Sequence, residues 1–160
     1  HLSDSVEELI ERQWSMNIKA LPSSEIEASK GLEDVLAYIL ENELSASVAS
    51  SSRGDFVQAV FDHLNLWPFM EAYTSGQEIE HGKPAPDIYI LAARKIGVRA
   101  EECLAVEDST AGVRSAKAAG MITVGYRNPT SQGQDVGMAD YVVDCLSDIC
   151  NIIDKINSRK

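Results

Sequence analysis

The stretch that most constrains the fold is a short apolar run, Leu104–Val106, followed directly by two carboxylates. A run of this kind is typical of a buried strand in a parallel sheet. Glu107 and Asp108 lie at the carboxyl end of the predicted strand, and a helix begins after Ser109. Ligands of open α/β sheets bind at the carboxyl ends of the strands, beside helix N-termini. The stretch therefore predicts a polar site at one edge of an α/β sheet.

The acidic pair has two interpretations. Neighbouring carboxylates repel each other and are costly to desolvate unless a cation or hydrogen-bond donors offset their charge. In the first interpretation, Glu107 and Asp108 hold a hard metal ion such as Mg²⁺, which binds carboxylate and water oxygens and often bridges to a substrate phosphate. In the second, Asp108 or Ser109 caps the helix that follows.

Strand and helix patterns alternate along the chain. This alternation predicts βα units and a mainly parallel sheet that helices cover on both faces. A capping box and apolar residues at helical spacing predict the first helix. The predicted helices cover residues 6–18, 32–40, 56–64, 88–96, 110–119 and 146–156, and the predicted strands cover residues 44–49, 72–75, 104–106, 121–126 and 141–143.

Composition limits the class of protein. The 160 residues are enough for one core, and a hydrophobic content of 44% argues against disorder. A formal net charge of -11 argues against nucleic acid as a partner. No apolar run predicts a membrane span, and no signal peptide is evident. The odd number of cysteines, without C-x-x-C spacing, predicts buried free thiols and a cytoplasmic protein; they are Cys103, Cys145 and Cys150.

Two further strand ends carry polar residues. Ser50 follows the predicted strand Leu44–Ala49, where a hydroxyl and the backbone N–H groups of the next turn suit a phosphate oxygen. The alternative is a serine-rich turn that caps the next helix. Lys83 lies in a loop that Pro84 and Pro86 stiffen, which suits a counter-charge for a phosphoryl group. The alternative is an ordinary surface lysine.

The Ser50 hydroxyl, Lys83 and the acidic pair each occur in the same sequence of elements, in which a strand is followed by polar residues and then by a helix. We therefore expect Ser50, Lys83 and Asp108 to point into one crevice at the same edge of the sheet. A metal ion, a cation and a hydroxyl in one crevice describe a phosphoryl-transfer site.

Three stretches together are similar to the motifs of a known family: Val48–Ser52, Gly82–Tyr89 and Val106–Val113. In this order they resemble the haloacid dehalogenase-like (HAD) superfamily of phosphotransferases, and within it the β-phosphoglucomutase-like branch. The similarity runs from the first helix to about Tyr126. It implies a three-layer, Rossmann-like α/β core with a mainly parallel sheet, preceded by the last helix of an α-helical cap domain.

The resemblance implies a role for each matching residue. Ser50 would hydrogen-bond the transferring phosphoryl group, and Lys83 would neutralise that group and the nucleophile. Glu107 and Asp108 would hold Mg²⁺.

The resemblance also implies residues that bind the rest of the substrate. Ser52 and Arg53 correspond to positions at which sugar-phosphate members bind the non-reacting phosphate. Arg12, on the first helix, falls near a position that contacts substrate, and the alternative for Arg12 is a solvated helix face.

The first motif of the family is absent from the sequence. It is Asp-x-Asp at the end of the first strand, where the first aspartate is the nucleophile and the second the general acid/base. The chain contains no Asp-x-Asp, and Asp4 lies on no predicted strand. The missing strand would be central, between the strands ending at Ser50 and Asp108, so we expect two apolar strand edges to face a gap.

These considerations predict a piece of a larger protein. Residues 1–21 would be the remnant of a helical cap, residues 22–30 a linker, and residues 31–160 a core without its first strand. The missing N-terminal segment of the same protein would be its partner, and the chain alone would be inactive.

The sequence thus predicts that the parent protein is a Mg²⁺-dependent phosphatase or phosphomutase for a small phosphorylated metabolite such as a sugar phosphate, with no nucleic acid or membrane as partner. A rival hypothesis is a non-catalytic regulatory or interaction module with an incomplete site. A third, a receiver-type signalling domain, conflicts with the order of serine, lysine and acidic pair, because receivers carry the acidic pair first and the lysine last.

Overall fold

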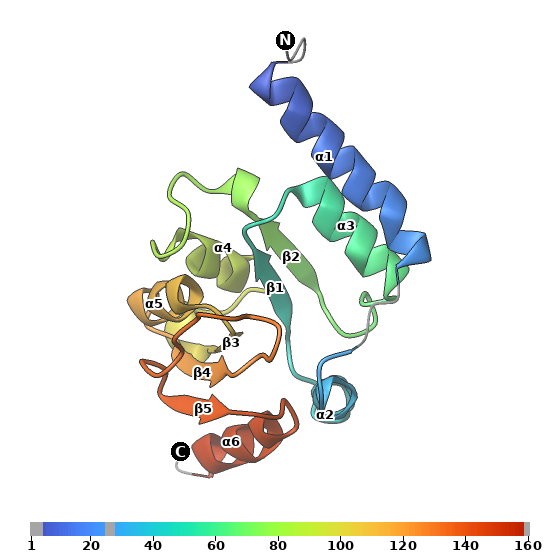
Figure 1. The fold of residues 1–160 in the computed structure, drawn as a ribbon. Helices are drawn as coiled ribbons and strands as arrows, with labels where there is room; N and C mark the ends of the chain where they lie inside the picture. Colours follow the sequence, from blue (N-terminus) through green and yellow to red (C-terminus); the bar gives the residue numbers. More distant parts are fainter. Residues whose placement is uncertain (1–4, 25–27, 159–160) are drawn as a thin grey trace.

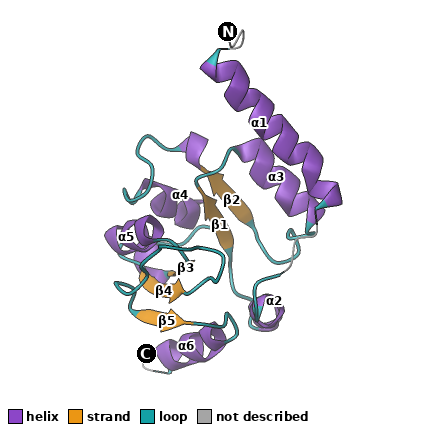
Figure 2. Ribbon diagram, viewed as in Figure 1, coloured by secondary structure: helices purple, strands orange, loops and turns teal. Residues whose placement is uncertain are grey.

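The computed structural model describes residues 5–24 and 28–158, in which helices and strands alternate as predicted (Figure 1, Figure 2). Short 3₁₀ turns occur at Leu21–Ser23, Gly76–Glu78 and Ala100–Glu102. The α-helices are α1 (Val6–Ala20), α2 (Leu32–Glu41), α3 (Gly54–His63), α4 (Asp87–Lys95), α5 (Thr110–Ala118) and α6 (Asp148–Asn157). The strands are β1 (Ser47–Ser50), β2 (Ala72–Ser75), β3 (Leu104–Glu107), β4 (Ile122–Tyr126) and β5 (Tyr141–Val143).

The strand pairings among the described residues are all parallel, and they form two separate sheets. One sheet has the order β1-β2, with Ser50 opposite Ser75, and the other has the order β3-β4-β5, with Glu107 opposite Gly125. In this part of the chain β1 and β3 are therefore not hydrogen-bonded to each other. Because the strands of each sheet run parallel, their carboxyl ends lie at one edge.

Helices cover the strands on two sides, which gives three layers. Helix α4 packs on β1 and β2, α5 packs on β3 and β4, and the two helices contact each other. On the other side α2 and α6 contact each other and pack against the core cluster that includes residues of β4 and β5, and α6 lies beneath β5 in the view of Figure 1. Helix α3 packs on β2, and α1 lies against α3, where the rings of Trp14 and Phe56 are 5.4 Å apart.

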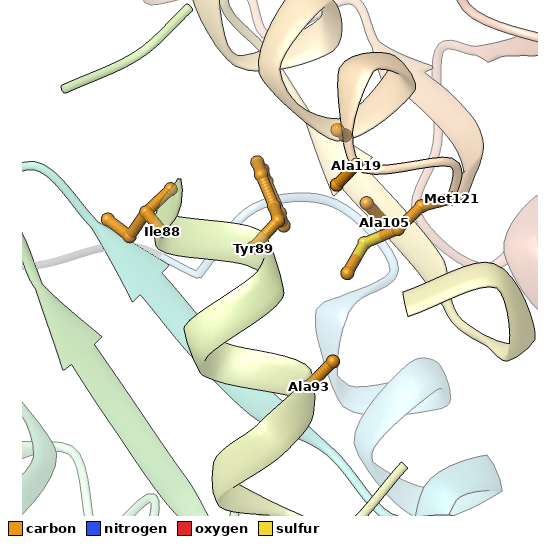
Figure 3. Packing of buried hydrophobic residues seen from close by; sticks show 7 residues of the cluster. Ile88, Tyr89, Ala93, Ala105, Ala119 and Met121 are labelled. Carbon is orange, nitrogen blue, oxygen red and sulfur yellow. The ribbon is translucent and has the colours of Figure 1, made fainter. Parts of the chain in front are cut away.

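One core cluster joins the α4 and α5 layer to β3 (Figure 3). Ile88 is fully buried, and Tyr89 beside it is 7% exposed. Alanines on the facing surfaces allow the elements to approach closely, because a methyl group is the whole side chain. The other members of the cluster are Ala93, Ala105, Ala116, Ala119 and Met121.

Several details of the sequence prediction are confirmed and others are wrong. The capping box of Ser5 and Glu8 begins α1. The strand predicted from Leu44 begins only at Ser47, because the Leu44 N–H donates to the Ile39 carbonyl (2.9 Å) and so belongs to the end of α2. The three cysteines are free but half-buried rather than buried. No helix in residues 5–24 or 28–158 has the length and apolarity needed to cross a bilayer.

Asp140, in the turn before β5, ties that turn to β4. Its carboxylate accepts from Lys117 Nζ (2.7 Å) and from the N–H and hydroxyl of Thr123 (2.8 Å each). The Lys117 hydrogen bond, reinforced by those of Thr123 and opposed by partial burial, lowers the pKa of Asp140 to about 2.

Asp140 therefore predicts a pH dependence of stability. A carboxyl whose pKa is about 2 when folded and near 3.8 when unfolded stabilises the chain above pH 3.8, and this contribution disappears as the pH falls toward 2. In Asp140→Asn we expect the free energy of unfolding, from urea titrations at several pH values, to fall less steeply across that window. Asp144→Asn, at a side chain that is 77% exposed, is the control and should keep the wild-type slope. An unchanged slope in Asp140→Asn would contradict the assignment.

Candidate active site

The carboxyl ends of β1 and β3 border a cavity of about 460 Å³. The structure brings four of the residues singled out from the sequence to its wall: Ser50, Lys83, Glu107 and Asp108. They come from three strand ends that are far apart along the chain, those of β1, β2 and β3. The rest of the wall consists of Ser29, Val48, Ala49, Ser51, Val106, Ser109, Tyr126, Asn128 and Leu146.

Ser50 is the last residue of β1. Its hydroxyl oxygen accepts the Ser52 N–H (3.1 Å), which closes a tight turn, and within the described residues no group accepts its proton. The side chain of Ser50 does not cap α3, whose N-cap residue, Arg53, makes no side-chain capping bond. The Ser50 hydroxyl is therefore able to donate to an acceptor in the cavity.

Lys83 and Glu107 form a nearly buried ion pair, with side chains 12% and 8% exposed. Lys83 Nζ donates to Glu107 Oε1 and to the carbonyl of Ala49 (3.2 Å). The Tyr89 hydroxyl donates to Glu107 Oε1 (2.5 Å), and the Ser109 hydroxyl donates to Oε2 (3.0 Å). Both oxygens of Glu107 thus have protein donors, which offset the cost of burying its charge.

Burial and the negative charge of Glu107 raise the pKa of Tyr89 well above its usual value. The phenol is therefore protonated at every physiological pH and serves as a fixed donor to Glu107. Gly112 in α5 completes this environment, because a Cβ there would lie 2.0 Å from the Glu107 carboxylate. Ser109 caps α5 by accepting the Gly112 N–H (3.0 Å), so the capping interpretation holds for Ser109.

Asp108 is held differently from Glu107. Its Oδ2 accepts from Asn128 Nδ2 (2.8 Å) and from the Ser131 hydroxyl (2.6 Å). Its Oδ1 has no hydrogen-bond partner among the described residues and is available to a ligand. Sequence reasoning missed Asn128 and Ser131, although Asn128 follows β4, the strand next to β3, and that position was the available signal.

Within the described residues no group of three or more His, Cys, Asp or Glu side chains is arranged to hold a metal ion. Asp108 nevertheless fits part of a Mg²⁺ site, since Mg²⁺ is commonly bound through one or two carboxylates together with waters and substrate phosphate. Glu107 fits this role less well, because its oxygens already accept from Lys83, Tyr89 and Ser109.

The remaining candidates do not line the cavity. The guanidinium of Arg53 pairs with Glu11 of α1 and with Asp55 (2.7 Å), and the hydrogen bond that it donates to Glu11 raises the pKa of Arg53. Ser52 contributes its backbone to the turn at Ser50, and Arg12 is an exposed residue of α1. Ser52, Arg53 and Arg12 therefore do not line the cavity with the other four residues, and their roles in binding substrate stay predictions.

Residues 2–126 match the model of a family described as haloacid dehalogenase-like hydrolase. The chain therefore belongs to the haloacid dehalogenase-like hydrolase family. The matched region contains Ser50, Lys83, Glu107 and Asp108.

Relatives place the chain in the β-phosphoglucomutase-like branch of the HAD family. It is 31% identical over 138 residues to beta-phosphoglucomutase of Bacillus subtilis (strain 168), covering 86% of this chain and 58% of that protein. It is 35% identical over 81 residues to fructose-1-phosphate phosphatase YqaB of Escherichia coli (strain K12), covering 51% of this chain and 43% of the relative. The chain thus spans about half the length of these relatives.

The fold is that of solved HAD proteins. CbbY from Rhodobacter sphaeroides, crystallised with phosphate, superimposes with a TM-score of 0.84 over 92% of this chain and 67% of CbbY, at 23% sequence identity. This similarity confirms the predicted Rossmann-like α/β fold with parallel strands.

Proposed function

We propose that this chain forms most of the catalytic core of a Mg²⁺-dependent phosphatase or phosphomutase that acts on a small phosphorylated metabolite, with sugar phosphates as the substrate class. The observation that carries the proposal is the cavity in which the Ser50 hydroxyl, the Lys83 ammonium and the Asp108 carboxylate meet. The names of two relatives, a fructose-1-phosphate phosphatase and a beta-phosphoglucomutase, support the substrate class.

Each side chain has a distinct task in this proposal. Ser50 donates a hydrogen bond to a phosphoryl oxygen, and Lys83, held by Glu107 and the Ala49 carbonyl, offsets negative charge on the phosphoryl group. Asp108 is the carboxylate that would hold Mg²⁺, and a bound Mg²⁺ would supply positive charge to offset the negative charge of the phosphoryl group. Glu107 keeps Lys83 in position and has the weaker claim to direct metal binding.

The nucleophile, in this proposal, comes from a further parallel strand between β1 and β3. Among the described residues each of these strands pairs on one side only, and an unpaired edge is able to accept a further strand. An apolar strand of this kind is expected to be buried, but Val106 in β3 is 41% exposed. The reason is that Val106 borders the cavity rather than a neighbouring strand. A segment of the same protein ending in Asp-x-Asp would cover Val106 and bring an aspartate beside Ser50 and Asp108.

We also propose that residues 1–21 belong to a helical cap and residues 22–30 to a linker. Residues 1–4 and 25–27 of these segments lie outside the described part of the chain. Free cysteines and a net charge of -11 support a reducing, cytoplasmic location and a small-molecule rather than a nucleic-acid partner.

Turnover of p-nitrophenyl phosphate and of hexose phosphates with Mg²⁺ tests the function. We expect none from this chain alone, and turnover when the residues encoded upstream of it are joined to its N-terminus. In the joined protein, Asp108→Asn should lower kcat/KM at least 100-fold. Asp62→Asn, on α3 and outside the cavity, is the control. Turnover by the chain alone, or wild-type activity in Asp108→Asn, would contradict the proposal.

A further inference from the structure

The loop that follows β4 holds Asp108 in one orientation, and we propose that Asn128 and Ser131 are positioning residues for the cation site. The inference rests on the proposed function, because it takes Asp108 as the carboxylate that binds a divalent cation. In this proposal Asn128 and Ser131 contact Asp108, and they contact neither the cation nor the substrate.

The two donors act on the same oxygen. Asn128 Nδ2 lies 2.8 Å and Ser131 Oγ 2.6 Å from Asp108 Oδ2, whereas Oδ1 accepts no hydrogen bond from the described residues. A carboxylate held through one oxygen cannot rotate freely about its side-chain bonds, so its other oxygen has a defined direction. Since Asp108 and Asn128 both line the cavity, that direction is set at the cavity wall.

Thr130 determines which way the Asn128 amide faces. The N–H of Thr130 (3.1 Å) and its hydroxyl (2.8 Å) both donate to Asn128 Oδ1. Because the amide oxygen of Asn128 faces these two donors, its NH₂ group faces the opposite side, where Asp108 lies. The Ser131 N–H also donates to the Asn128 carbonyl (3.0 Å), so the turn that presents both side chains is itself closed by a backbone bond.

The loop is anchored beyond the turn as well. Gln134 Oε1 accepts the Thr110 N–H at the start of α5 (2.9 Å), and the Thr110 hydroxyl accepts the Asp135 N–H (2.7 Å). Val136 is buried, 6% exposed, against Gly125 of β4, where a Cβ would lie 2.7 Å from the valine side chain. The position of the loop, and hence of its two donors, is therefore established when the chain folds rather than when a ligand binds.

Binding of Mn²⁺ to this chain, measured by electron paramagnetic resonance of the free ion, tests the inference. We expect Asn128→Ala and Ser131→Ala each to weaken binding about 10- to 100-fold. Thr130→Val, which removes one of the two donors to Asn128, should weaken it less and in the same direction. The control is Asn42→Ala, whose amide donates to the Tyr38 carbonyl at the end of α2 and should not affect the ion. Circular dichroism establishes that each variant is folded.

Asp108→Asn separates this inference from the proposed function. If Asp108→Asn abolishes Mn²⁺ binding while Asn128→Ala and Ser131→Ala bind as tightly as the wild type, the positioning role is overturned and the metal assignment stands. If the wild type binds no Mn²⁺, or Asp108→Asn binds it equally well, the metal assignment and the inference both fail. A crystal structure of Asn128→Ala is an independent readout: we expect the Asp108 carboxylate to change orientation, and an unchanged carboxylate would contradict the inference.

Discussion

Replacing Lys83 with methionine is expected to lower the free energy of unfolding by about 3–5 kcal/mol. The reason is that Glu107, only 8% exposed, would keep its negative charge in the interior after losing the ammonium group that offsets it. Tyr89 and Ser109 would still donate to the carboxylate, but neither carries a positive charge. Urea denaturation followed by circular dichroism at pH 7 gives the change directly.

Two variants control this prediction. Combining Lys83→Met with Glu107→Gln removes both charges, and we expect the double variant to recover most of the lost stability. Lys95→Met breaks a more exposed ion pair, with Glu78, whose side chains are 28% and 37% exposed, and should cost about 1 kcal/mol or less. A cost below about 1 kcal/mol for Lys83→Met would mean that the Lys83–Glu107 pair is not buried in solution.

The second large effect is expected from Gly112→Ala. A Cβ at this position would lie 2.0 Å from the Glu107 carboxylate, so the two groups cannot both keep their places. Relief would require moving a carboxylate that Lys83, Tyr89 and Ser109 hold from three sides. Overpacking usually costs about 1–3 kcal/mol, and we expect a loss at the upper end of that range or beyond it.

Gly54→Ala is the matched control because Gly54, like Gly112, lies in the first turn of a helix. An added Cβ at Gly54 would meet only ordinary van der Waals contacts, of which the nearest is the Ser75 hydroxyl oxygen at 3.5 Å. We expect this variant to be as stable as the wild type or up to about 1 kcal/mol more stable. Thermal melts of both variants make the comparison, and equal stability of Gly112→Ala and Gly54→Ala would refute the steric argument.

The order of the elements could be predicted from the sequence because hydrophobic periodicity is a local property. The capping box at Ser5 and the strand ends at Ser50 and Asp108 depend on residues only a few positions apart. Element boundaries were less accurate. Leu44 belongs to a run in which apolar and polar residues alternate as in a strand. In the structure, however, the Leu44 N–H donates to the Ile39 carbonyl in the turn that follows α2, and the alternating pattern does not predict that hydrogen bond.

The candidate site also has one part that local sequence patterns predict and another that depends on contacts between distant residues. Parallel strands bring their carboxyl ends to one edge of a sheet, so the βα pattern was enough to predict Ser50, Lys83 and Asp108 together. Because β1 and β3 belong to separate sheets, the packing of α4 on β1 and on α5 also helps to bring these ends to one cavity. The ion pair of Arg53 is an example of what reasoning from the βα pattern cannot supply. Helix α1 packs on α3 and brings Glu11 to the guanidinium, a contact between residues 42 positions apart. The role of Arg53 in binding the non-reacting phosphate stays a prediction.

The sequence by itself determined the alternation of strands and helices, the family and the side chains that meet at the cavity, because each of these follows from local patterns and from the geometry of parallel strands. Only the tertiary structure decided how the two adjacent carboxylates differ. Glu107 is enclosed by Lys83, Tyr89 and Ser109, whereas Asp108 is held through one oxygen by a loop 20 and more residues further along. Hydrogen bonds between distant residues exist only once the layers have packed, so no local pattern encodes them.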